Sequence, residues 1–103
     1  MSVREELERR LCALPELEKR PSRYGDSNSY FVGGREIAHF HGDGRMDLRL
    51  TRGEIRRLKS EQALDHRVRT RGPSAEWAEV HVAEVTDIPY VISLVEEAIR
   101  ANS

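Results

Sequence analysis

Apolar residues recur every three or four positions in three segments of the chain, which is the spacing of an amphipathic helix. Pro15 ends the first apolar stripe, because the residue before a proline avoids the helical conformation. The second begins with Thr51 and Glu54, which have the spacing of a capping box. The pattern predicts helices over residues 2–14, 51–60 and 87–99, with Ser2, Thr51 and Asp87 as the N-caps.

The segments between these helices alternate apolar and polar residues with a period of two, which is typical of strands with one buried face. In residues 45–50, for example, Met46 and Leu48 point to the side opposite Asp47. Glycines separate the runs, as tight hairpins require. We expect strands near residues 28–32, 36–41 and 45–50, a weaker strand near 20–24, and two later strands within 66–71 and 75–85.

The order of these elements indicates the fold class. Runs of strands joined by short connections favour an antiparallel sheet, with the helices collected on one of its faces. Arg67, Arg69 and Arg71 alternate along one strand, and a row of cations is expected of a strand at the sheet edge. The sequence therefore predicts one α+β domain over residues 1–103, with an antiparallel sheet of about five strands and helices packed on one face.

Bulk composition narrows the class of protein. The chain has 103 residues and a mean hydropathy of −0.66, and its 17 basic and 18 acidic residues give no overall field that attracts nucleic acid. Its single cysteine, Cys12, can form neither an internal disulfide nor a cysteine-based zinc site. No apolar run has membrane-spanning length and the start is not leader-like, so we expect a cytoplasmic location. No motif predicts a cofactor.

The segment EIAHFHGDGRMDLRL carries the clearest candidate chemistry. His39 and His41 are two apart on a predicted strand, so both imidazoles project from the same face, about 7 Å apart at their Cα atoms. That spacing allows both rings to bind one metal ion if a third ligand is present. The spacing is not the helical one of known metal motifs, so it does not single out a metal. The candidates for the third ligand are Asp43, Asp47, His66 and His81.

Other uses of these residues stay open. A histidine oriented by Asp47 could act as a base toward water, and a metal-dependent hydrolase is one such reading. Residues 45–71 hold nine Arg or Lys against four Asp or Glu and could bind RNA or another anion. The sheet face bearing His39 and His41 could instead be covered by a second copy of the chain, as in a homodimer. A small molecule or a protein partner is the occupant that we expect most.

The sequence also resembles a known family. The stretches GGREIAHFHGDGRMDLRLTRGEIRRL and ALDH, followed by a tryptophan strand and a C-terminal helix, are similar to the small "luciferase domain" family of microbial proteins, over roughly residues 27–99. The resemblance carries over to a family-like set of site residues: His39, His41, Asp47, His66 and Trp77.

The resemblance implies a shared fold with no assigned activity. The family name implies a light-emitting oxidation, but the flavin-dependent luciferases use a barrel of about 250 residues, which 103 residues cannot close. The chain also lacks a glycine-rich dinucleotide fingerprint. We therefore expect a binding or interaction domain rather than an enzyme, with any site around His39, His41 and Asp47.

Overall fold

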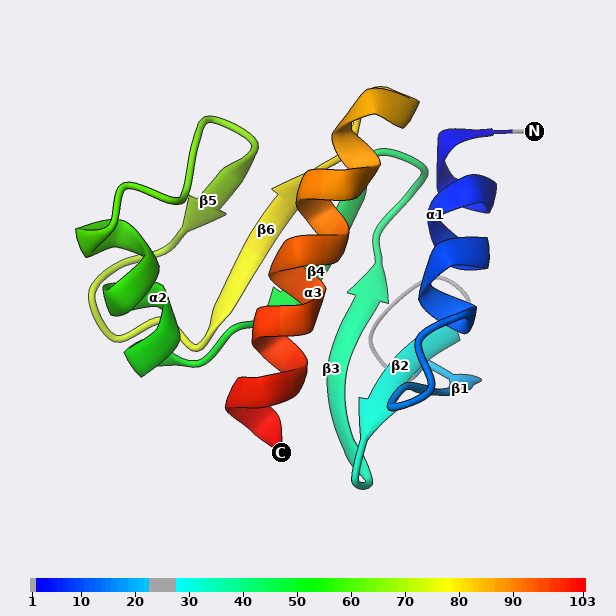
Figure 1. Cartoon of the computed structure of the whole chain (residues 1–103), viewed down its shortest axis with the longest axis horizontal. Helices are drawn as coiled ribbons and strands as arrows, with labels where there is room; N and C mark the ends of the chain where they lie inside the picture. Colours follow the sequence, from blue (N-terminus) through cyan, green and yellow to red (C-terminus); the bar gives the residue numbers. More distant parts are fainter. Residues whose placement is uncertain (1, 23–27) are drawn as a thin grey trace.

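An open antiparallel sheet carries the helices on one of its faces (Figure 1). The computed structural model describes residues 2–22 and 28–103. Its elements are α1 (Val3–Cys12), β1 (Glu18–Pro21), β2 (Asn28–Val32), β3 (Arg35–Phe40), β4 (Arg45–Arg49), α2 (Arg52–Ser60), β5 (Val68–Thr70), β6 (Trp77–His81), the 3-10 turn η1 (Val85–Asp87) and α3 (Ile88–Asn102).

The strands follow the order β1-β2-β3-β4-β6-β5, and every neighbouring pair is antiparallel. The predicted α+β class and the order of elements are confirmed, and the described residues form six strands where about five were expected. The arginine-bearing strand β5 lies at one edge of the sheet, as its row of cations predicts. The weaker strand expected near 20–24 corresponds to β1, which begins and ends earlier, and residues 23–27 lie outside the described residues.

The core lies between the sheet and the helices. On β4, Met46 and Leu48 are wholly buried, whereas the residues between and beside them face the other side of the sheet. Helix α3 lies across the middle of the sheet in Figure 1 and buries Val91 and Val95 against it, while α1 covers β2 and contributes Leu7. Burying apolar side chains of this size contributes roughly 1.5–3 kcal/mol each, so this layer holds the fold together.

A bulge interrupts the alternation on β3. Tyr30 pairs with Ala38, but the next residue, Phe31, pairs with Glu36, so the ladder skips Ile37. Ile37 is wholly buried and belongs to the core cluster. Regular alternation along residues 36–41 would place Ile37 on the same face as His39, but one extra residue enters β3 at this point and Ile37 turns into the core instead.

The helix caps follow the sequence only in part. Ser2 and Glu5 form a complete capping box at the start of α1. Thr51 accepts a hydrogen bond from the Glu54 amide, as expected, but the Glu54 carboxylate bonds Arg57 instead of returning to the cap. Asp87 stands at the N-cap of α3 without capping it through its side chain.

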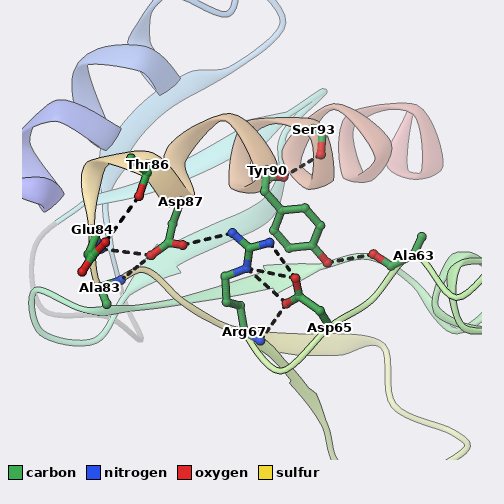
Figure 2. A network of polar contacts seen from close by, with 9 residues as sticks. All are labelled: Ala63, Asp65, Arg67, Ala83, Glu84, Thr86, Asp87, Tyr90 and Ser93. Carbon is green, nitrogen blue, oxygen red and sulfur yellow. Dashed lines mark hydrogen bonds and ion pairs between the residues drawn. The ribbon is translucent and has the colours of Figure 1, made fainter.

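The Asp87 carboxylate instead joins a polar network that ties the edge strand to α3 (Figure 2). It accepts hydrogen bonds from the Ala83 and Glu84 amides on one oxygen and from Arg67 on the other. The Arg67 guanidinium also binds Asp65 at 2.6 Å. The network therefore holds the turn before β5 and the turn before α3 to one another.

Tyr90 completes this network from α3. Its ring lies 4.0 Å from the Arg67 guanidinium carbon, a cation–π contact, and its hydroxyl donates to the Ala63 carbonyl at 2.8 Å (Figure 2). The hydrogen bonds from Arg67 lower the pKa of Asp65 to about 2.

Within the described residues, no helix is both long and apolar enough to cross a bilayer.

Candidate functional site

His39 and Asp47 lie directly opposite each other on β3 and β4. His39 Nε2 is 3.3 Å from Asp47 Oδ2, and His41 Nε2 is 3.1 Å from the same oxygen. The two imidazole rings meet edge to face, with their centroids 4.9 Å apart. We call these three residues the His–Asp cluster. The Nε2 atom of each histidine lies close to the same oxygen of Asp47.

The sheet geometry explains this convergence. His39 and His41 are two apart, so the pleat turns both to the side opposite Phe40, which is in the core. His41 lies just past the end of β3, where its amide donates to the Arg45 carbonyl and keeps it in register with β4. The cluster therefore lies on the face that the helices leave open.

A second set of polar groups surrounds the cluster on its β2 side. Glu36 Oε1 lies 3.5 Å from His39 Nδ1, and the bulge at Ile37 is what brings Glu36 to this face. Both His39 Nδ1 and the hydroxyl of Ser29, which faces His39 across the ladder, are buried without a hydrogen-bond partner among the described residues. A buried polar group left unpaired costs about 1–3 kcal/mol, so each of these two groups requires an explanation.

Arg45 borders the cluster on its β4 side. Its Nε lies 3.1 Å from Asp47 Oδ1 and 3.3 Å from a Glu79 oxygen, so one guanidinium contacts two carboxylates. The side chains of Glu36, Asp47 and Glu79 are 14, 17 and 19% exposed. The two imidazoles thus lie among three largely buried carboxylates, and the Arg45 guanidinium contacts two of these carboxylates.

Trp77 extends the site toward the sheet edge. Its ring centroid is 5.2 Å from that of His39, in a tilted contact. Beside Trp77 the surface is hollowed into a groove of about 350 Å³. The groove is lined by Arg45, Asp47, Arg69, Arg71, Ala75, Glu76, Trp77, Ala78 and Glu79. Asp47 thus belongs to both the His–Asp cluster and the groove.

The other predicted ligands lie apart from this cluster. Asp43 stands in the turn after His41, with its side chain 90% exposed and an Arg4 nitrogen 4.0 Å away. His66 is exposed in the turn before β5, and His81 is exposed at the end of β6. In the described part of the chain, the donor atoms of His39, His41 and Asp47 lie close enough together to hold a metal ion, whereas His66, His81 and Asp43 belong to no such group of three.

Glu36 and Glu79 are site residues that sequence reasoning did not single out. Glu36 reaches His39 because of the bulge, and a one-residue bulge has no clear signal in this sequence. Glu79 reaches Arg45 because β6 pairs with β4, which is set by the strand order. Its position two residues after Trp77 on an alternating strand does indicate that it shares the tryptophan face.

The basic segment 45–71 is less open to an anionic partner than its composition suggests. Arg45, Arg49, Arg57 and Arg67 each form ion pairs with neighbouring carboxylates. Five of its nine cations form no ion pair within residues 2–22 and 28–103, and they are Arg52, Arg56, Lys59, Arg69 and Arg71. Only Arg69 and Arg71 among these five line the groove.

The fold and the site together define a small α+β domain whose polar centre lies on the sheet face opposite the helices. The family model described as Luciferase domain matches residues 34–98, more than half of the chain. The chain therefore belongs to the luciferase domain family, and the matched range includes the His–Asp cluster, Glu36, Trp77 and Glu79. No curated protein and no solved structure matches it.

Proposed function

We propose that this domain binds a small organic anion with a flat ring, in the groove between Trp77 and the edge strand β5. The observation that carries the proposal is that one indole and two arginines without ion-pair partners, Arg69 and Arg71, line the same hollow. A flat ring can stack on the indole while a carboxylate is bound by a guanidinium, which is well suited to bidentate contacts. The groove volume of about 350 Å³ suits a small ligand.

Two arginines of the groove, Arg69 and Arg71, are the groups that favour an anion there. Asp47, Glu76 and Glu79 line it together with Arg45, Arg69 and Arg71, so the charges of the lining balance. Glu76 is paired with Arg49, while Asp47 and Glu79 share Arg45. Arg69 stands opposite Glu79 in the ladder and forms no ion pair with it. Arg69 on β5 and Arg71 just after it are therefore the two cations of the lining that form no ion pair within the described residues, and they are the groups that an anion would contact.

The single tryptophan offers a direct test. We expect 4-hydroxybenzoate to shift the indole N–H signal of Trp77 in a saturable titration followed by NMR, and the uncharged 4-hydroxybenzamide to bind at least about tenfold more weakly. Arg71→Ala should lose about tenfold in affinity, because it removes a charge-assisted contact. Arg56→Ala, an exposed arginine outside the groove, serves as the matched control and should bind as the wild type does.

Three results would contradict this proposal. Equal affinities for 4-hydroxybenzoate and 4-hydroxybenzamide would show that the groove does not select an anion. A Trp77 signal that shifts with neither compound would show that neither binds there. A change in the Trp77 signal with protein concentration alone would indicate that a second copy of the chain covers this face, as in a homodimer.

A further inference from the structure

We propose that His39, His41 and Asp47 bind one divalent first-row transition-metal ion. Their donor atoms all lie within 4.8 Å of one another. Asp47 Oδ2 is 3.3 and 3.1 Å from the two imidazole Nε2 atoms. Ligand atoms held at 2.0–2.1 Å from zinc lie about 2.9–3.4 Å apart in tetrahedral or octahedral geometry, and both contacts fall in that range.

The surrounding groups are those that orient metal ligands. A metal-binding histidine commonly donates its second ring N–H to a carboxylate, and His39 Nδ1 has Glu36 Oε1 at 3.5 Å. A proton on Nδ1 leaves the Nε2 lone pair facing the space in front of Asp47. The other Asp47 oxygen accepts from Arg45 Nε at 3.1 Å, which fixes the carboxylate plane. Arg45 thus holds Asp47 by a hydrogen bond, and the Glu36 carboxylate lies within ion-pair distance of His39 Nδ1.

The charges around the cluster favour a dication. Glu36, Asp47 and Glu79 contribute three negative charges and Arg45 one positive charge, and each of the three carboxylates is less than one-fifth exposed. This leaves an excess of two negative charges in a poorly solvated place, which is costly unless it is compensated. A divalent ion restores neutrality.

The donor set determines the class of metal. Two imidazole nitrogens with one carboxylate oxygen favour zinc, iron(II) and their first-row neighbours, whereas calcium and magnesium take oxygen ligands. Three protein ligands leave at least one coordination position for water or an added ligand. His41 has a side chain that is 36% exposed, so the centre is reached from solvent. The proposal does not depend on the groove, because no organic ligand takes part in it.

The test is a titration of the chelator-treated 103-residue protein with zinc, followed by calorimetry, and with Co²⁺, followed by its visible absorption bands. We expect wild-type protein to bind one equivalent. His39→Ala and Asp47→Asn should weaken binding at least about 100-fold, because each removes a ligand. Glu36→Gln should weaken it by about 10- to 100-fold, as expected of a positioning residue outside the coordination shell. His81→Ala and His66→Ala are the matched controls and should bind as wild type does.

A measurement on the wild-type protein guards against variants that fail to fold. Zinc should shift the Nε2 nitrogen signals of two of the four histidines, while the other two stay in place. Undiminished zinc affinity in His39→Ala, or a wild-type protein that binds no metal at micromolar concentration, would overturn the proposal. Running the 4-hydroxybenzoate titration with chelator present tests the groove separately, so the failure of either proposal leaves the other measurable.

Discussion

His39 and Asp47, opposite each other on β3 and β4, place an imidazole nitrogen 3.3 Å from a carboxylate oxygen on the sheet face that the helices leave open. Because the two strands are neighbours in a hairpin, little rearrangement is needed to bring these atoms together. A site built on strands is held more rigidly than one built on loops. The contact therefore gives the open face a fixed polar centre.

The tilted contact between Trp77 and His39 makes the tryptophan a reporter of that centre. The ring centroids are 5.2 Å apart, so a paramagnetic ion bound at His39 should quench the indole emission. We expect Co²⁺ to quench the fluorescence until one equivalent is bound, and excess zinc to restore it. His39→Ala should show no quenching over the same range, while His81→Ala should match wild type. Equal quenching in His39→Ala would place the ion elsewhere.

Leu48 tests the core beneath the site. It is wholly buried on β4, on the face opposite Asp47. We expect Leu48→Ala to lower the free energy of unfolding by about 2–5 kcal/mol, because it removes apolar contacts and leaves a cavity. Val85→Ala, at a side chain that is 54% exposed, should change it by less than about 0.5 kcal/mol. Urea denaturation followed by circular dichroism measures both, and similar losses would argue against this layering.

The Asp65–Arg67 contact should make stability depend on pH in acid. The folded-state pKa of Asp65 is lowered to about 2 by Arg67, from an ordinary value of 3.8. The unfolded chain therefore binds a proton at higher pH than the folded chain does. The stabilisation is complete above about pH 4 and is lost as the pH falls toward about 2.

Arg67→Ala should make the free energy of unfolding depend less on pH in this range, because it removes the guanidinium that lowers the pKa of Asp65. Arg69→Ala, two residues along the same edge strand, should leave the slope unchanged. Urea midpoints collected between pH 2 and 5 provide the comparison. An Arg67→Ala slope as steep as that of wild type would show that other carboxylates are responsible.

The Thr51 side chain caps α2, but the Thr51 backbone is in a strained conformation. Its φ of 75° and ψ of 153° lie in a region that is almost restricted to glycine, while its hydroxyl caps α2 by accepting from Glu54. Thr51→Gly should stabilise the protein by about 1 kcal/mol, since relief of strain exceeds the few tenths lost at the cap. Thr51→Ala keeps the strain, loses the cap and should destabilise by about 1 kcal/mol. Shifts of the same sign in thermal unfolding would contradict this reasoning.

The parts of the fold that local patterns determine could be predicted from the sequence. The three helices follow from apolar spacing, and β4 follows from the alternation of Met46 and Leu48 with charged residues. The same alternation predicts that His39 and His41 share a face and that Asp47 is within reach from the next strand. These predictions need only the pleat and a short hairpin.

Other features depend on long-range pairing and could not be read from local patterns. Glu36 joins the site because β3 takes in one extra residue opposite Tyr30 and Phe31, and Glu79 joins because β6 crosses back beside β4. Asp43, close in sequence to both histidines, turns outward at the hairpin tip. His66 also fails to reach the cluster, because the segment after α2 leads to the far edge of the sheet.

X-ray absorption at the zinc edge of the zinc-loaded protein tests the central claim most directly. Our account predicts a first shell of two imidazole nitrogens and a carboxylate oxygen at about 2.0–2.1 Å, completed by water, that loses its imidazole signature in a protein with His39→Ala and His41→Ala together. A first shell of oxygen alone, a sulfur ligand from Cys12, or a spectrum unchanged in that double variant would contradict it.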